Sequence, residues 1–289
     1  MPAREPKARD LTAADLPAAV SLSAGVGWNQ VAADWRVFVD HGHVTALDDE
    51  EGRLAATAAI LPFGPELAWI SMVIVRPDQR GRGLATRLLE RCVGEVRATG
   101  RTPGLDATPA GRPVYLRLGF EDCFTLTRWR RSAPAVLAPS VPLRGLSVRS
   151  LEPGDWPRIE ALDRQAFGSD RAFLLRGLGA RAAGFAAVGE DEAGRLVGFV
   201  LGRDGRTAAH LGPLVAGSEE VALALAAHVV AHLADAVTID VADRFAGVAR
   251  WLAASGFTME RPFTRMYHER SVTFGDPGHV IAIAGPELG

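Results

Sequence analysis

Glycine and arginine residues are concentrated in one segment whose pattern can bind an anion. Residues 73–85 begin as an apolar β-branched run, stop at Pro77 and pass through Gly81 and Gly83 before a helical pattern starts. Glycine allows backbone conformations that other side chains forbid. The unpaired N–H groups of a helix N-terminus lie at the positive end of the helix dipole, where they favour a phosphate. The segment therefore predicts a phosphate site between a strand and a helix.

A buried strand and an amphipathic helix must hold this segment in place. The apolar run 70–75 is typical of a strand, and Pro77 cannot continue its hydrogen-bonding ladder. The helix is indicated by apolar residues at helical spacing, namely Leu84, Leu88, Leu89, Cys92, Val93 and Val96. A helix of this pattern would bury one face and present its first turn to the ligand.

The motif differs from two common phosphate-binding loops and is similar to a third. No Lys-Ser or Lys-Thr pair follows the second glycine, as a nucleotide P-loop requires, and the glycine spacing is not that of the dinucleotide fingerprint. The run Arg80-Gly81-Arg82-Gly83-Leu84-Ala85 resembles the pyrophosphate loop of the GNAT acetyltransferases, Arg/Gln-x-x-Gly-x-Gly/Ala, at every defined position. The alternative interpretation is an exposed basic turn before an ordinary amphipathic helix.

Three sequence matches in the same order indicate an internal repeat. They pair residues 9–17 with 149–157, 49–55 with 191–197, and 115–120 with 251–257. Each copy predicts a first strand, a helical region, an antiparallel hairpin, a central strand, the loop helix, a further strand, a short helix and a final strand. This order resembles that of the GNAT fold.

We therefore expect an α+β protein of two tandem GNAT-like domains, each a twisted mixed and mostly antiparallel sheet flanked by helices. The predicted N-terminal domain spans residues 1–131 and carries the cofactor site and the chemistry. A Pro/Ala-rich linker is predicted at residues 132–145, and the C-terminal domain at residues 146–289.

The second copy departs from the motif where the loop is expected. Residues 216–222 contain no Arg-x-x-Gly-x-Gly/Ala, and Glu219 and Glu220 stand where amides and arginines should meet a pyrophosphate. Like charges within a few ångströms repel by about 1 kcal/mol each. We expect no coenzyme A in this copy, whose role would be to cover the first copy, to shape the acceptor pocket or to form an oligomer contact. A homodimer is left open.

The resemblance implies acetyl-CoA as co-substrate, bound along the first copy. Backbone groups of Val73 and Val75 would hold the pantetheine arm in a gap between two splayed parallel strands. The pyrophosphate would bind the loop, through the amides and arginine charges of Arg80, Gly81, Arg82, Gly83, Leu84 and Ala85. Thr108 would cap the next helix or contact the pantetheine. The family usually has asparagine and alanine at the positions of Thr108 and Gly111.

The resemblance also implies direct attack of a neutral amine on the acyl carbonyl, which requires a base, and an acid for the leaving thiolate. Tyr115 occupies the position of the family's usual general acid, and a phenol with a pKa of about 10 stays neutral at working pH. Glu66 and Asp106, at the ends of neighbouring strands, are the candidate bases. The alternatives are a tyrosine that only packs under its helix, solvated strand-end carboxylates and a proton relay through water.

The acceptor side is expected in the helical region after the first strand. Trp28, Asn29, Asp34 and Trp35 combine aromatic and acidic groups, as a small cationic amine would require. The alternative is that both tryptophans anchor those helices. Residues 280–289 are apolar for an exposed terminus, and we expect this segment to dock at the domain junction.

The composition argues against several other functions. The chain has 289 residues, a formal net charge of −2 and 48% hydrophobic residues, which is typical of a globular two-domain protein without a nucleic-acid partner. Its apolar stretches are too short for a membrane, and residues 1–7 lack the apolar core of a signal peptide. Cys92, Cys123, His41 and His43 form no metal-ligand pattern. We expect a cytoplasmic protein without a metal.

The favoured hypothesis is an acetyl-CoA-dependent N-acetyltransferase that acetylates the primary amine of a small molecule. A non-catalytic acetyl-CoA sensor is one alternative, and a turnover assay separates it from an enzyme. A second alternative is a tandem enzyme similar to mycothiol synthase, for which the resemblance predicts an intact loop in the second copy. A protein-lysine acetyltransferase is the third, and an acidic open groove would favour it.

Overall fold

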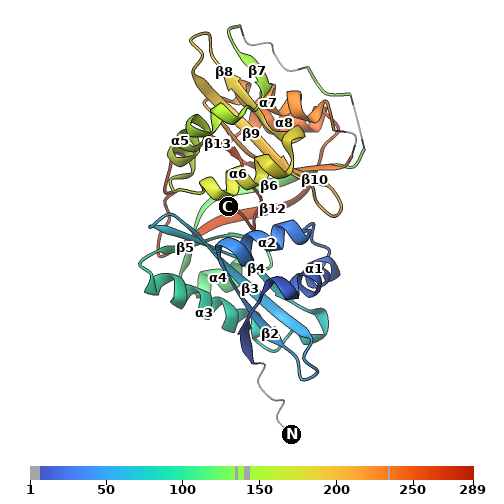
Figure 1. Cartoon of the computed structure of the whole chain (residues 1–289), viewed down its shortest axis with the longest axis vertical. Coiled ribbons are helices and arrows are strands. Elements are labelled where there is room, and N and C mark those ends of the chain that lie inside the picture. Colours follow the sequence, from blue (N-terminus) through green and yellow to red (C-terminus); the bar gives the residue numbers. More distant parts are fainter. Residues whose placement is uncertain (1–6, 134–135, 140–143, 234) are drawn as a thin grey trace.

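The protein consists of two halves that repeat one order of elements and meet near the C-terminus (Figure 1). The computed structural model describes residues 7–133, 136–139, 144–233 and 235–289. Residues 1–6, which the signal-peptide expectation concerned, and parts of the predicted linker lie outside the described residues. Strands and helices alternate in both halves, which confirms the α+β class.

The first half contains the predicted hairpin, central strand and loop helix. Its strands are β1 (Ala8–Asp10), β2 (His43–Asp48), β3 (Leu54–Phe63), β4 (Leu67–Val75), β5 (Thr102–Ala107) and β6 (Phe120–Arg131). Its helices are η1 (Ala13–Asp15), α1 (Leu16–Gly25), α2 (Ala32–His41), η2 (Pro77–Gln79), α3 (Leu84–Ala98) and α4 (Arg112–Arg117). The buried residues of α3 are the six apolar residues that the helical spacing predicted.

The second half repeats this order and adds one strand. Its strands are β7 (Ser147–Ser150), β8 (Ala187–Glu190), β9 (Leu196–Arg203), β10 (Ala209–Ala216), β11 (Val237–Ala242), β12 (Thr258–His268) and β13 (Val280–Ala282). Its helices are η3 (Pro153–Asp155), α5 (Trp156–Phe167), α6 (Ala172–Arg181), η4 (Ala183–Phe185), α7 (Glu219–Val230) and α8 (Ala246–Ala254). Among the described residues, no helix is both long and apolar enough to cross a membrane.

Matching ion pairs support the repeat at the level of single contacts. In the first half, Arg9 on β1 binds Asp15 at 2.9 Å. In the second half, Arg149 on β7 binds Asp155 at 2.7 Å. Each arginine also pairs with an acid at the end of the neighbouring strand, because the same residue types recur at the same spacing.

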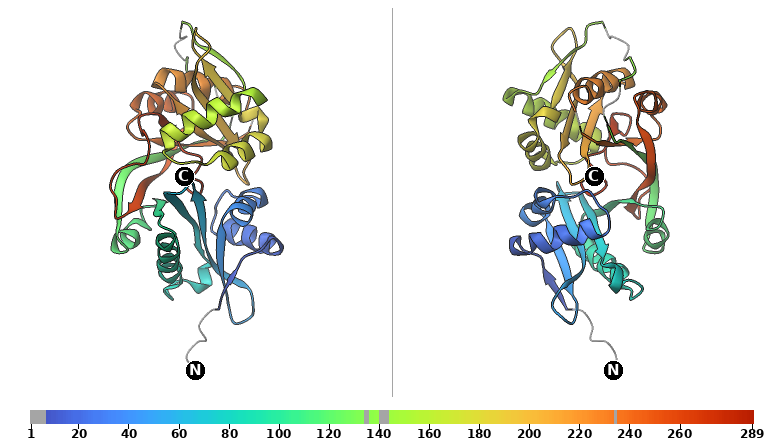
Figure 2. Two further views of the ribbon diagram at one scale, coloured as in Figure 1. Left: turned by 60° about the vertical axis from the view of Figure 1, so that its left-hand side comes forward. Right: turned by 90° about the vertical axis from the view of Figure 1, so that its right-hand side faces the viewer.

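The two halves exchange their last long strands and so share one sheet. In order, the described strands of this sheet are β1-β2-β3-β4-β5-β12-β6-β11-β13-β10-β9-β8-β7. Thus β12 of the second half pairs with β5 of the first, whereas β6 of the first half pairs with β11 of the second. The two strands also pair with each other, and they run between the halves in Figures 1 and 2. The predicted boundaries between the domains stay a prediction, and strand pairing crosses them.

Two equivalent buried ion pairs hold the exchanged strands. Arg265 on β12 donates from Nε and Nη2 to Asp106 on β5, at 2.9 and 2.8 Å. Arg128 on β6 donates in the same way to Asp240 on β11, at 2.7 and 2.7 Å. Each arginine is the eighth residue after the phenylalanine of the repeated Gly-Phe pair that opens its strand. The same side-chain contact therefore joins each half to the strand of the other.

The C-terminal segment fills a gap in the sheet of the second half. β10 and β11 pair in parallel only from Ala209 to Leu211 on β10, and then diverge. β13 lies in the space between them and pairs with β10 at Leu214 and with β11 at Val241. The chain continues from there to the contact between the two halves, where Arg171 donates to the oxygen of Gly289. The predicted docking of this segment at the junction is thus confirmed.

Candidate active site

The loop before α3 owes its shape to two glycines in a left-handed conformation. Gly81 has a φ of +75° and Gly83 a φ of +73°. A Cβ atom built on either glycine meets no atom within 4 Å, so the backbone conformation and not the available space requires glycine. Gly83 is the N-cap of α3, and the first turn of the helix contains no acidic residue. The loop therefore offers an uncapped helix N-terminus to an anion.

A bulge interrupts the central strand β4 beside this loop. The register between β3 and β4 shifts after Thr57, and Met72 has a φ of +50°, which is rare for a residue with a side chain. The hydroxyl of Thr57 donates to the carbonyl oxygen of Met72 at 2.8 Å. The bulge turns the backbone of β4 away from its neighbour, at the place where a ligand would run along the strand.

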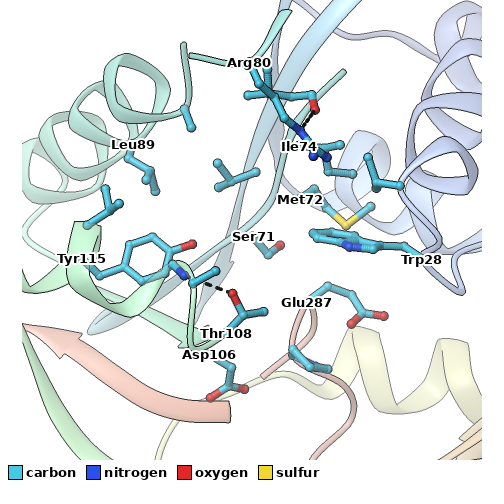
Figure 3. Close-up of a pocket in the computed structure, with 18 of the residues that line it drawn as sticks. Trp28, Ser71, Met72, Ile74, Arg80, Leu89, Asp106, Thr108, Tyr115 and Glu287 are labelled. Atoms are coloured by element: carbon cyan, nitrogen blue, oxygen red, sulfur yellow. Dashed lines mark hydrogen bonds between the residues drawn. The ribbon is translucent and has the colours of Figure 1, made fainter. Parts of the chain in front are cut away.

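The strands β4 and β5 separate after a short parallel stretch and leave a cavity. They pair at Leu67, Ala68 and Trp69 on β4, and beyond this point the gap opens. The cavity has a volume of about 520 Å³. Of the predicted site residues, its walls include Trp28, Asn29, Val73, Val75, Arg80, Gly81, Gly83, Leu84, Ala85, Asp106, Thr108 and Tyr115. Figure 3 shows Arg80 at one end and Asp106 and Glu287 at the other.

Tyr115 presents its hydroxyl to the middle of the cavity, toward Ser71 on the facing strand (Figure 3). Burial of the phenol raises the pKa of Tyr115 to about 12. The ring packs against Gly111, where a Cβ atom would lie 2.9 Å from it. The hydroxyl of Thr108 accepts a hydrogen bond from the N–H of Gly111, the N-cap of the short helix α4, at 3.2 Å. Thr108 and Gly111, the two departures from the family pattern, are therefore bonded to each other beside the ring of Tyr115.

Two family models match this chain, one in each half. The model described as "Acetyltransferase (GNAT) family" matches residues 18–120, and the model described as "Acetyltransferase (GNAT) domain" matches residues 159–282. The chain is a tandem GNAT protein. It is accordingly an acyltransferase, of a family whose acyl donor is acetyl-CoA.

Individual proteins support this assignment over most of the chain. The tandem GNAT protein is 22% identical to the uncharacterised N-acetyltransferase YitH of Bacillus subtilis, over 93% of each chain. It is 33% identical to the mycothiol acetyltransferase of Acidothermus cellulolyticus, over 42% of this chain and only 37% of that protein. The crystal structure of a protein from Pyrococcus horikoshii aligns over 99% of this chain and 96% of that protein's chain, with a TM-score of 0.80 at 19% identity.

A further solved structure has the same tandem arrangement. It is a tandem GNAT protein from the clavulanic acid biosynthesis pathway, with a TM-score of 0.64 at 17% identity, and it covers 91% of this chain and 98% of its own. At such identities, these structural likenesses show the fold of the tandem GNAT protein alone.

The two carboxylates predicted as bases lie in different environments. Asp106 lines the cavity, and its buried side chain accepts hydrogen bonds from the Nε and Nη2 atoms of Arg265. Its counterpart Asp240 makes the same contact in the half without an open gap, so the pair is explained by the strand exchange. Glu66 lies at the start of β4, away from the loop and outside the cavity, where its carbonyl oxygen accepts from the Thr102 N–H. Asp106 therefore lies at the cavity and Glu66 does not, and the role of a base stays a prediction for both.

Two of the four predicted acceptor residues, Asn29 and Asp34, hold the halves together, and Asn29 also lines the cavity. The amide of Asn29 donates to the carbonyl of Ala208 at 2.8 Å, and its oxygen accepts from the Thr207 N–H at 2.7 Å. Asp34 is buried and forms ion pairs with Arg181 and Arg203 of the second half.

Trp35 and Arg82 also lie outside the cavity, whereas Trp28 lines it. Trp35 is a core residue whose indole N–H donates to Ser23 at 3.2 Å, as the anchoring alternative expected. Arg82 is exposed and bonded to Gln79. Trp28 faces the cavity from the side opposite Tyr115 (Figure 3).

Sequence reasoning missed several residues that line the end of the cavity away from Arg80. They are Gln30, Ser71, Arg128, Arg261, Phe263, Pro286 and Glu287. Most come from the exchanged strands β6 and β12 and from the C-terminal segment, which the chain brings to the first half only through its tertiary fold. A lone arginine on a strand carries no local signal of this role. Among the described residues, no group of three or more histidine, cysteine or acidic residues could hold a metal ion.

The equivalent position in the second half is closed in two ways. β13 occupies the gap between β10 and β11, at the position that corresponds to the cavity of the first half. At the start of α7, Ser218 accepts from the Val221 N–H, and Glu219 accepts from the Val248 N–H at 2.9 Å. The groups that would meet a pyrophosphate are therefore acceptors and already bonded.

Proposed function

We propose that this tandem GNAT protein transfers an acetyl group from acetyl-CoA to the primary amine of a small-molecule acceptor, in its first half. One contrast carries the proposal. The gap between β4 and β5 opens into a cavity beside a glycine loop, whereas the gap between β10 and β11 contains the protein's own strand β13. Only the first half keeps both the loop and the space that an acyl donor requires.

The residues around the cavity fit acetyl-CoA at each of its parts. The left-handed glycines Gly81 and Gly83 and the first turn of α3 would hold the pyrophosphate, with Arg80 adding positive charge. Val73 and Val75 lie beyond the bulge on the strand edge that faces the gap, where their backbone groups would bond the pantetheine arm. When bound, acetyl-CoA supplies an activated acyl group and a thiolate leaving group.

Tyr115 is the acid in this proposal, because its hydroxyl is neutral and points into the cavity. It would donate its proton to the departing thiolate. Asp106 and Glu287 are the carboxylates of the cavity wall, and both are ion-paired, to Arg265 and Arg203. The acceptor amine would therefore lose its proton to water before or during the attack, and the rate should follow the amine's own pKa.

The remaining expectations about partners belong to the same proposal. A small amine fits a cavity of this size better than a protein side chain does. The net charge of −2 gives no support to a nucleic-acid partner. We further propose a cytoplasmic enzyme without a membrane partner, and a homodimer stays open.

Calorimetric titration of acetyl-CoA tests where it binds. We expect one site per chain, and we expect Gly83→Glu to abolish it, because the substitution places a carboxylate and a strained residue in the loop. Gly52→Glu is the matched control, since Gly52 also has a positive φ of +77° in open space but lies in the turn between β2 and β3, outside the cavity wall. Two sites per chain, or unchanged binding to Gly83→Glu, would contradict the assignment to the first half. Release of free thiol on addition of amines separates an enzyme from a sensor.

A further inference from the structure

Three side chains of the cavity wall have buried polar atoms without a hydrogen-bond partner. They are the Oε1 atom of Gln30, the Oγ atom of Ser71 and the Nε atom of Arg261. Buried polar groups are almost always bonded in proteins, because leaving one unpaired is unfavourable. A cavity with one acceptor, one hydroxyl and one cationic donor unsatisfied has room for a ligand with matching groups.

The charges around the end of the cavity near Glu287 cancel except at one residue. The pairs are Asp106 with Arg265, Glu287 with Arg203, and Arg128 with Asp240. Arg261 is the cation left over. Within the described part of the chain, no carboxylate lies within ion-pairing distance of it, and its closest recorded partner is the ring of Phe263, 5.1 Å from its guanidinium carbon.

The strand register places Arg261 directly opposite Arg128. The two residues are cross-strand partners on β12 and β6, and both line the cavity. Like charges opposite each other in a sheet are destabilising. Asp240 binds Arg128 through both of its oxygens, which leaves the charge of Arg261 without an ion pair. Arg128 and Arg261 together therefore lack one negative charge, on the side that faces the cavity.

We propose that the acceptor amine carries a carboxylate, which Arg261 binds, so that the substrate class is amino acids. This inference rests on the proposed acetyl transfer in the first half. The carboxylate of the acceptor accepts from Arg261, and its amino group donates to Gln30 Oε1. Ser71 lies on β4 between Tyr115 and Trp28 (Figure 3), so an amine held from this end faces the bulge of the strand.

Turnover tests the class directly. The twenty amino acids and their carboxamides are compared as acceptors with acetyl-CoA, and thiol release is measured. We expect the best amino acid to exceed its own amide by about 10- to 100-fold in kcat/KM, as for loss of one charge-assisted hydrogen bond. The assay is run below the pKa of both amines, where the amide has the larger neutral fraction because the pKa of its amine is lower, so the protonation of the amine does not produce this preference. Equal or better turnover of the amides overturns the inference.

The substitution Arg261→Gln assigns the preference to one residue. We expect KM for the amino acid to rise by about 10- to 100-fold, with little change for the amide or for acetyl-CoA affinity. Arg261→Lys keeps the charge and should restore part of the preference. Arg244→Gln is the matched control, because Arg244 also stacks on a phenylalanine, at 4.4 Å, but lies outside the cavity wall. A preference that survives Arg261→Gln overturns the assignment.

Binding without turnover separates this inference from the proposed function. Amino acids and amides are titrated into the complex of the wild-type protein with coenzyme A, by calorimetry. Binding of the acids that Arg261→Gln abolishes supports the inference even if no thiol is released, in which case the proposed function alone fails. Turnover of amines without any preference for acids refutes the inference and leaves the proposed function. If the amino acids neither bind nor are turned over in preference to the amides, the inference is also refuted.

Discussion

Tyr115 is set apart from the second tyrosine of the chain by where its hydroxyl points and not by its pKa. Burial raises the pKa of both Tyr115 and Tyr267 to about 12. Tyr115 lines the cavity, whereas Tyr267 is a core residue of β12 outside it. Tyr115 is thus the candidate acid, and Tyr267 is the control for a substitution of a buried tyrosine.

The substitution Tyr115→Phe tests the acid. We expect kcat to fall by about 100-fold or more, the contribution of a general acid, with acetyl-CoA affinity retained. Tyr267→Phe should reduce kcat only as far as it reduces the folded fraction. A Tyr115→Phe variant within about twofold of wild type would exclude the role.

The pH profile of the wild type tests the same residue independently. A phenol with a pKa of about 12 is neutral, and so able to donate, at every lower pH. We therefore expect kcat/KM to rise as the acceptor amine loses its proton and then to stay level to about pH 11. A falling limb at about pH 10 would show that Tyr115 titrates at its ordinary value, or that another acid acts.

At the scale of elements, the exchange of β6 and β12 explains why a carboxylate of the cavity wall is ion-paired to an arginine. Asp106 and Asp240 make equivalent bidentate pairs with Arg265 and Arg128, one in each half. A planar guanidinium that binds both oxygens of a carboxylate fixes the register of the two strands.

The substitutions Asp106→Asn and Asp240→Asn should therefore behave alike. Each leaves a buried arginine without its counter-charge, and we expect a loss of about 3–5 kcal/mol in the free energy of unfolding, measured by chemical denaturation. At a temperature where both variants are folded, their kcat values should fall by similar factors. A loss of kcat in Asp106→Asn about 100-fold beyond that in Asp240→Asn would restore Asp106 as a base.

At the scale of the whole molecule, the strand exchange makes two similar halves into one body. The sheet is continuous across them, and the contacts of Asn29 and of the buried Asp34 with the second half add to the junction. The C-terminal segment contacts both, since β13 completes the second half and Pro286 accepts from the indole of Trp69 in the first.

We expect one unfolding transition for the whole chain. Thermal melts followed by far-ultraviolet circular dichroism and by tryptophan fluorescence should coincide, because neither half can lose the strand of the other without losing its own sheet. Acetyl-CoA at about 100 times its Kd should stabilise the folded state by about 2.7 kcal/mol and move both signals together. Two separated transitions, of which only one responds, would contradict this coupling.

The sequence by itself determined the structural features that depend on residues close together in the chain. The buried face of α3 followed from helical periodicity, and the left-handed Gly81 and Gly83 from a loop that only glycine can form. The order of elements and the repeat followed from local matches, because turns, caps and strand patterns act over a few residues. The family resemblance to GNAT proteins rested on the same local motifs.

Only the tertiary structure decided which strands pair and therefore which residues line the cavity. The repeat places the same residue types on β6 and β12, so no local pattern predicts that each of them pairs with a strand of the other half. The roles of Asp106 and Arg261 depend on that choice, and the closing of the second gap depends on β13, 64 residues or more beyond β10. Contacts over such separations are selected by the packing of the whole sheet, and the sequence pattern of a single strand is compatible with either partner.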